Sequence, residues 1–110
     1  VTFEGGKTAF IEANWLTPYK IRKLIVTGSE AIMTLDYMTQ EITMETAGQT
    51  LAPRYEVKEP LKLELQHFAK SILDGREPMI TGIDGLKALQ IAEAALKSAR
   101  IGAAVKLNPL

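Results

Sequence analysis

Apolar residues recur at helical spacing in the second half of the chain and alternate with polar residues in the first half. In the second half, Glu59-Pro60 predicts the start of a helix, because proline is favoured at the first helical position. Asp74-Gly75 predicts its end, since glycine readily takes the left-handed conformation that closes a helix. The apolar stripe of this helix has spacings of three and four, and comprises Leu61, Leu65, Phe68 and Ile72.

A second helical pattern runs from Ile83 to Ile101 and is followed by Gly102. Thr81 is placed to cap this helix, and Asp84, three residues later, gives an aspartate form of the capping box. One side of the helix carries only small residues, which are Gly85, Ala88, Ala92, Ala95 and Ala99. Small side chains allow a close neighbour, so this side predicts packing either against the chain's own sheet or against another domain.

Short strands are predicted in the first half and at the end of the chain. Gly5-Gly6 favours a two-residue primed hairpin turn, and Gly28-Ser29-Glu30 favours a second turn. Pro53 lacks an N–H, so its strand should lie at a sheet edge or begin late. The expected strands are Val1–Glu4, Lys7–Trp15, Ile21–Thr27, Ala31–Tyr37, Met38–Glu45, Leu51–Lys58 and Ala104–Leu107.

Short strands, tight turns and two following helices predict an α+β fold in which residues 1–110 form a single domain. We expect a predominantly antiparallel, open-faced sheet with the two C-terminal helices packed on one face. Leu24-Ile25-Val26 and Ala31-Ile32-Met33 are apolar without a break, so apolar side chains project from both faces. Because the helices cover only one face, we expect a second copy to cover the other in a homo-oligomer.

Composition excludes several classes of partner. Lys plus Arg and Asp plus Glu each number 13, so the net charge is zero. The chain therefore has no excess of positive charge that would predict nucleic acid or an anionic membrane as a partner. No apolar run reaches the roughly 18–20 residues that span a bilayer. Cysteine is absent, which removes disulfides and thiolate metal ligands and fits a cytoplasmic protein. The chain opens directly on a strand-like stretch at Val1, which we interpret as a cut within a longer protein.

Residues suited to catalysis are sparse. The single histidine, His67, has Leu63 and Ser71 as helical neighbours, and this place at the edge of a stripe favours a packed or surface role. No Gly-x-Gly-x-x-Gly follows a strand, and the spacing of Gly82 and Gly85 fits a helix start. No group of His, Asp and Glu has metal-ligand spacing. We therefore predict no catalytic, cofactor-binding or metal-binding residue in the chain.

Three motifs in the second half resemble the end of a Gfo/Idh/MocA (glucose–fructose oxidoreductase / inositol dehydrogenase) family enzyme. They read E-P-L-x-x-E-L-x-x-F from Glu59, G-R-E-P-x-x-T-G-x-D-G-L from Gly75 and A-L-x-I-A-E-A-A-L-x-S-A from Ala88. The resemblance covers nearly the whole chain. It implies the distal part of the C-terminal substrate and oligomerisation domain of an NAD(P)-dependent dehydrogenase acting on a sugar, polyol or nucleotide-sugar.

The resemblance also implies what this chain lacks. Enzymes of this kind bind NAD(P) in an N-terminal Rossmann domain, and transfer protons through the lysine of a Glu-Lys-Pro motif and the histidine of Asp-x-x-x-His. Neither motif occurs here, and Leu63 stands where the aspartate would precede His67. The resemblance thus implies NAD(P) in the full-length protein and no cofactor bound by this part alone.

One segment matches the region that such enzymes place near a small sugar-like substrate. Trp15 offers an apolar face to a sugar ring and Tyr19 a hydroxyl, while Lys20 and Arg22 offer cations to a carboxylate or phosphate. Trp15 also continues the apolar side of its predicted strand, and the two cations also suit a solvated surface. These four residues are the candidate substrate-binding set, with packing and solvation as the alternatives.

Two functions remain open from the sequence. The first is the C-terminal portion of a dehydrogenase that also has a Rossmann domain. The second is a stand-alone α+β dimerisation module without redox chemistry. A glycine-rich βαβ unit and a Glu-Lys-Pro motif encoded upstream of Val1 would distinguish the first from the second.

Overall fold

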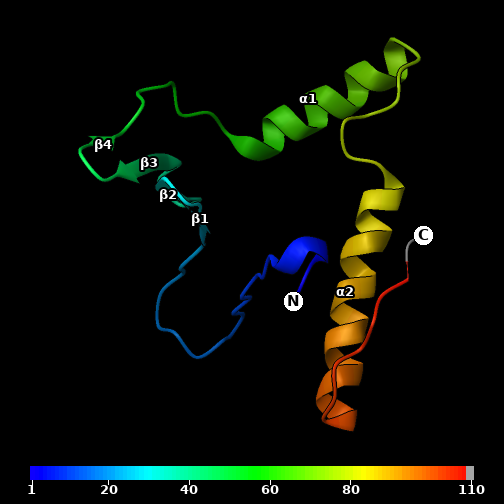
Figure 1. Ribbon diagram of the computed structural model, residues 1–110. Helices are drawn as coiled ribbons and strands as arrows, with labels where there is room; N and C mark the ends of the chain where they lie inside the picture. The colour runs from blue at the N-terminus through cyan, green and yellow to red at the C-terminus, as the bar shows by residue number, and fades with distance from the viewer. Residues whose placement is uncertain (109–110) are drawn as a thin grey trace. The chain divides into compact units, whose positions relative to one another are not determined.

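The computed structural model describes residues 1–108. Along the chain these residues divide into two compact units, the first ending at Val57 and the second beginning at Lys58. The first unit contains the sheet and the second contains the helices (Figure 1). This composition confirms the predicted α+β class, with a predominantly antiparallel open sheet followed by two C-terminal helices. Each unit is described separately below.

The sheet has four strands, and each strand pairs with the next one along the chain. Its order is β1-β2-β3-β4, and all three pairings are antiparallel. Gly28 donates its N–H to the carbonyl of Ala31 at 2.9 Å, which closes the predicted turn between β1 and β2. The strands are β1 (Lys23–Thr27), β2 (Ala31–Asp36), β3 (Glu41–Thr46) and β4 (Thr50–Leu51).

The register gives the sheet two faces of different composition, because successive side chains of a strand point to opposite faces. We call one the apolar face, which carries Leu24, Val26, Ala31, Met33, Leu35, Ile42, Met44 and Leu51, with Thr46 as its one polar residue. We call the other the mixed face, where Ile25 and Ile32 lie among Lys23, Thr27, Thr34, Asp36, Glu41, Thr43, Glu45 and Thr50. Apolar side chains therefore do occur on both faces, as predicted, but unevenly.

The expected strands at the start of the chain are wrong. Val1–Glu4 and Lys7–Trp15 reduce to one isolated bridge between Thr2 and Thr8. The reversal between them takes three residues, the short 3-10 helix η1 (Glu4–Gly6), where Gly5 and Gly6 have φ of 77° and 76°. Backbone hydrogen bonds flank the bridge, since Phe3 donates its N–H to the carbonyl of Lys7 and Ala9 donates to that of Val1, both at 2.8 Å. No further strand lies beside it in the part of the chain described.

Two later strands are also wrong. The expected Leu51–Lys58 strand is only the two residues of β4, and Ala104–Leu107 forms no strand. β4 does lie at the edge of the sheet, as was expected for the strand predicted to contain Pro53. Thr46 donates its N–H to the carbonyl of Gln49 at 2.9 Å, so alternate residues of β4 direct their backbone groups toward β3. Counted in steps of two from Gln49, Pro53 is the next residue after Leu51 whose backbone points toward β3. Because proline has no N–H to donate, the pairing ends before it.

Both predicted helices are confirmed, with their predicted signals. Helix α1 (Pro60–Leu73) starts where the Glu59 carboxylate accepts the N–H groups of Leu61 and Lys62. It ends in a Schellman motif, because the N–H groups of Gly75 and Arg76 return to the carbonyls of Ile72 and Ser71. Within residues 1–108, Ser71 is the only residue classed as buried, and its hydroxyl donates to the carbonyl of His67 at 2.9 Å.

Helix α2 (Gly82–Ile101) begins at a complete capping box. Thr81 Oγ1 accepts the N–H of Asp84, and the carboxylate of Asp84 accepts the N–H and the hydroxyl of Thr81 at 2.9 and 2.8 Å. Gly102 closes the helix with φ of 67°. The side of small residues is exposed along its length, and no atom lies within 4 Å of a Cβ built on Gly85.

Replacing the helix-end and mid-helix glycines by alanine is expected to have opposite effects. Gly75→Ala should lower the free energy of unfolding by about 1 kcal/mol, because φ of 61° strains any residue with a Cβ. Gly85→Ala should raise it by about 0.5–1 kcal/mol, since alanine has the higher helix propensity and the space is open. Urea unfolding of both variants measures the difference. A larger loss for Gly85→Ala would show that the small side of α2 is tightly packed in solution.

Candidate functional site

The candidate substrate-binding residues lie on an irregular segment between η1 and β1. Trp15 is 101% exposed and Tyr19 is 69% exposed, and Lys20 and Arg22 are also exposed. Trp15 is therefore not part of a core within residues 1–108. These side chains belong to one short stretch of chain and are open to a ligand approaching from solvent.

Asn14 shapes the chain immediately around Trp15. Its Oδ1 accepts the N–H groups of Leu16 at 3.0 Å and Thr17 at 3.3 Å, which is the Asx turn typical of asparagine in loops. Its Nδ2 donates to the Glu12 carboxylate at 3.0 Å. The turn fixes the backbone on the C-terminal side of Trp15 and leaves the indole outside it.

The end of the candidate segment is held against the sheet. Tyr37 donates its N–H to the carbonyl of Arg22 at 2.9 Å, so Arg22 and Tyr37 are neighbours across β1 and β2. Tyr37 is 53% exposed and was not among the residues selected from the sequence. Only the strand register, which the sequence pattern did not define to the residue, brings this tyrosine beside Arg22.

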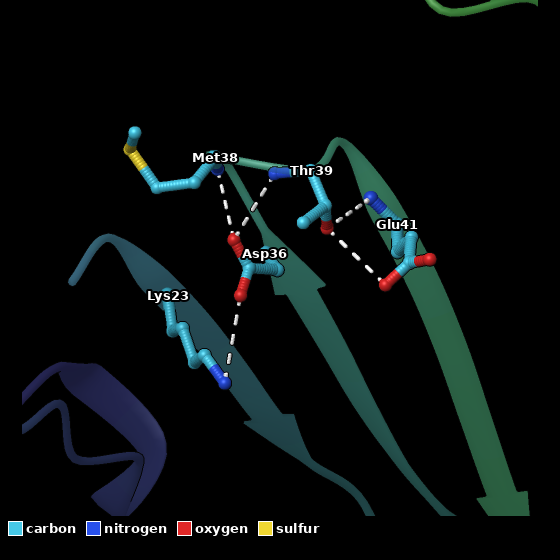
Figure 2. A network of polar contacts seen from close by, with 5 residues as sticks. All are labelled: Lys23, Asp36, Met38, Thr39 and Glu41. Carbon is cyan, nitrogen blue, oxygen red and sulfur yellow. Dashed lines mark hydrogen bonds and ion pairs between the residues drawn. The ribbon is translucent and has the colours of Figure 1, made fainter. Parts of the chain in front are cut away.

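A polar network surrounds the turn between β2 and β3 (Figure 2). Asp36 Oδ1 accepts the N–H groups of Met38 at 2.8 Å and Thr39 at 3.3 Å, and Asp36 Oδ2 lies 3.5 Å from Lys23 Nζ. Thr39 Oγ1 donates to the Glu41 carboxylate at 3.2 Å and accepts the Glu41 N–H at 3.3 Å. The hydrogen bonds of Asp36 and Thr39 join near neighbours of one hairpin and stabilise the turn, whereas the ion pair with Lys23 joins β1 to β2.

The carboxyls of Asp36 and Asp84 are both more acidic than usual. The backbone N–H of Met38 is the largest cause of the lowered pKa of Asp36, and the backbone N–H of Thr81 is the largest cause of the lowered pKa of Asp84. In each case the ionised carboxylate is the better hydrogen-bond acceptor, so folding favours the charged form.

Stability is expected to fall with acidification through these two groups. Each folded pKa lies below the unfolded value of about 4, so each contribution is complete above about pH 4 and is lost as the pH falls through the lowered folded pKa. Urea unfolding between about pH 2 and pH 6 gives the slope of the free energy of unfolding against pH. This slope should be flatter in Asp36→Asn and in Asp84→Asn than in the unmodified chain. Glu93→Gln, a carboxyl change on α2, is the control and should leave the slope unchanged.

An open hollow of about 560 Å³ lies between β3 and the chain that follows β4. Glu41, Ile42 and Thr43 line one side, and Pro53 and Arg54 lie on the other. The sequence pattern did not predict this hollow, because the expected strand Leu51–Lys58 would have filled it. The one available signal was Pro53, whose missing N–H interrupts pairing.

Residues 1–107 match a family described as "Oxidoreductase family, C-terminal alpha/beta domain". The chain belongs to the Gfo/Idh/MocA family. It is also 30% identical over 115 aligned residues to scyllo-inositol 2-dehydrogenase (NAD(+)) of Bacillus subtilis (strain 168), an alignment that covers 98% of this chain. The chain spans about a third (34%) of the length of that relative, and no solved structure matches it.

The one histidine of this Gfo/Idh/MocA domain is engaged by the loop between its helices. His67 Nε2 accepts the backbone N–H of Met79 at 2.9 Å, which occupies the lone pair that a general base would use. Because His67 lies on α1, twelve residues before Met79, this hydrogen bond connects the loop to the helix. The geometry therefore favours a structural role, and the absence of catalytic residues stays a prediction.

The described part of this family member holds neither a metal-ligand cluster nor a helix suited to crossing a membrane. Residues 1–108 contain no group of three or more His, Cys, Asp or Glu side chains placed to hold a metal ion. None of their helices is both long and apolar enough to cross a lipid bilayer. The segment around Trp15 is exposed, and the hollow beside β3 is open.

Proposed function

We propose that this chain is the C-terminal substrate-binding and oligomerisation portion of an NAD(P)-dependent dehydrogenase acting on a sugar, polyol or nucleotide-sugar. The observation that carries the proposal is the family match over residues 1–107. The relative named scyllo-inositol 2-dehydrogenase (NAD(+)) supports a polyol and NAD in the whole protein. An N-terminal Rossmann domain of the same protein would hold the cofactor.

Substrate binding is proposed for Trp15, Tyr19, Lys20 and Arg22. A sugar or polyol combines C–H surfaces with many hydroxyls, so an exposed indole beside hydroxyl and cationic donors suits it. The exposure of all four side chains on one segment supports this role. In this proposal the chain orients the substrate, while hydride transfer takes place at the nicotinamide bound by the Rossmann domain.

Oligomerisation is proposed through the mixed face of the sheet. Ile25 and Ile32 are 61% and 41% exposed there, beside threonines and charged residues. Interfaces between subunits that are also stable apart have this blend of apolar and polar surface. A two-fold axis lets the same face serve both partners. We therefore propose a homodimer or larger homo-oligomer.

The cofactor part of the proposal is tested by titrating NADH into the 110-residue chain and following NADH fluorescence. No saturable change is expected up to about 1 mM, because no glycine-rich turn leads into a helix N-terminus that would bind the pyrophosphate. Saturation in the micromolar range would contradict this assignment. The protein translated together with its upstream sequence is expected to bind NADH.

Activity separates the two functions left open by the sequence. The protein with its upstream sequence should reduce NAD(+) or NADP(+) when scyllo-inositol or another cyclic polyol is added. A protein that forms oligomers but neither binds nor reduces a nicotinamide would instead be the dimerisation module. Testing a panel of polyols, aldoses and nucleotide-sugars with both cofactors also defines the substrate class.

A further inference from the structure

Three charged residues form a row across one end of the mixed face. The register places Lys23 opposite Asp36, and Asp36 opposite Glu41 (Figure 2). Lys23 forms an ion pair with Asp36, but the two carboxylates are direct cross-strand neighbours. Like charges placed opposite each other destabilise a sheet. Within residues 1–108, neither a lysine nor an arginine forms an ion pair with Glu41.

The edge of β3 beside Glu41 is open. β4 pairs with β3 only at Thr50 and Leu51, and the following residues diverge from β3 around the hollow of about 560 Å³. Arg54 lines the hollow on the side across from Glu41, and it too has no ion pair in the described part of the chain. A carboxylate and a guanidinium that form no ion pair within residues 1–108 thus lie on opposite sides of one hollow.

The observed register defines what closure of this hollow would bring together. Thr50 pairs with Glu45 and Leu51 with Met44. Continued by one residue at a time, this register places Ala52 opposite Thr43, Pro53 opposite Ile42 and Arg54 opposite Glu41. Alternation of side chains then puts Pro53 on the apolar face and Arg54 on the mixed face.

We propose that Ala52–Arg54 is a strap that closes on the edge of β3 in the register of β4. Closure pairs the Arg54 guanidinium with the Glu41 carboxylate and completes a charge row of Lys23, Asp36, Glu41 and Arg54. The two acidic groups in the middle of the row are then flanked by a cation on each side. Closure also fills the hollow and covers the open edge of β3.

Pro53 explains why the strap can also stand open. In the continued register Pro53 and Ile42 form a hydrogen-bonded pair, in which the Ile42 N–H donates to the Pro53 carbonyl. The reciprocal bond cannot form, because proline has no N–H. Closure therefore lacks one ladder hydrogen bond and depends on the Glu41–Arg54 ion pair, which makes it sensitive to salt.

Proton NMR of the full chain tests the register directly. The pairs Thr43–Ala52 and Glu41–Arg54 are non-hydrogen-bonded pairs, whose Cα atoms approach to about 4.5 Å in an antiparallel ladder. We expect strong Hα–Hα cross-peaks for both pairs at low salt, and weaker ones in about 1 M salt. Absence of both cross-peaks at low salt, or cross-peaks in another register, would overturn the proposal.

Charge reversal tests the ion pair. Arg54→Glu should abolish the Thr43–Ala52 cross-peak, while Lys106→Glu, which changes net charge equally, should leave it intact. The double variant Glu41→Arg with Arg54→Glu should restore it, since the row then alternates in sign. Cross-peaks between β1 and β2 report in every variant that the sheet is folded. Persistence of the cross-peak in Arg54→Glu, or failure of a folded double variant to restore it, would refute the strap.

Replacing the proline provides an independent test. Pro53→Val supplies the missing N–H and a side chain favoured in strands, so the Ile42 amide should exchange with solvent about tenfold more slowly than in the unmodified chain. Ala104→Val, at a position in the C-terminal stretch, is the control and should leave that exchange unchanged. Equal Ile42 exchange in the unmodified chain and Pro53→Val would count against closure in this register.

Discussion

Val26→Glu is expected to unfold the sheet unit, whereas Ile25→Glu is expected to give folded monomers. The two residues are adjacent on β1 and are 52% and 61% exposed, but they point to opposite faces. Around Val26 the cross-strand neighbours are all apolar, and an apolar surface of this extent is rarely left in water. A carboxylate among these apolar side chains should therefore lower the free energy of unfolding by about 3 kcal/mol or more.

Ile25 has Thr34 as its cross-strand partner on the mixed face, which is the face proposed to bind a second copy. The polar residues of this face allow it to be exposed to water in a monomer. A carboxylate there should block association with little loss of stability. Sedimentation equilibrium at about 10–100 µM, a range in which weak dimers dissociate, measures the mass, and thermal unfolding measures the stability. An unmodified chain that stays at 12.1 kDa throughout would refute the proposed interface.

If the proposed function holds, Trp15→Ala is expected to lower kcat/KM for the polyol by roughly 10- to 100-fold in the full-length protein. Burying a large apolar side chain against a ligand contributes about 1.5–3 kcal/mol, and this is lost on truncation. The change should appear mainly in KM, because the role proposed for the indole is to bind the substrate and not to take part in hydride transfer.

Phe10→Ala is the matched control for this measurement. Phe10 is 102% exposed on the same irregular segment and lies outside the candidate set. It should leave kcat/KM unchanged within about twofold, since no substrate contact is lost. Equal losses in the two variants would show that the segment has a general structural role, and no loss in either would remove Trp15 from the site.

The helices were predictable because their signals are local. Glu59-Pro60, the Thr81–Asp84 capping box and the two closing glycines each act within a few residues, and the structure contains all of them. Strands need a partner elsewhere in the chain, so their extent was predicted less well. The pattern found the three central strands, but it extended Leu51–Lys58 past Pro53, where the hydrogen-bonding phase of β4 stops pairing.

The candidate site could be located by resemblance but not built from the sequence. A pattern places Trp15 and Arg22 on one stretch, yet it does not show that Tyr37 lies beside Arg22. That contact depends on the register of β1 against β2. If the register slips by one residue, every cross-strand pair changes. The ion pair between Lys23 and Asp36 depends on the same register.

The strand order also sets how quickly the sheet can assemble. Every strand pairs with its sequence neighbour, so no pairing has to wait for a distant part of the chain. The turn of the β2–β3 hairpin is held by a side chain, since the Asp36 carboxylate accepts the N–H groups of Met38 and Thr39. Isolated hairpins form in about 1–10 µs. This sheet is therefore expected to nucleate at that hairpin and to grow outward by adding β1 on one side and β4 on the other.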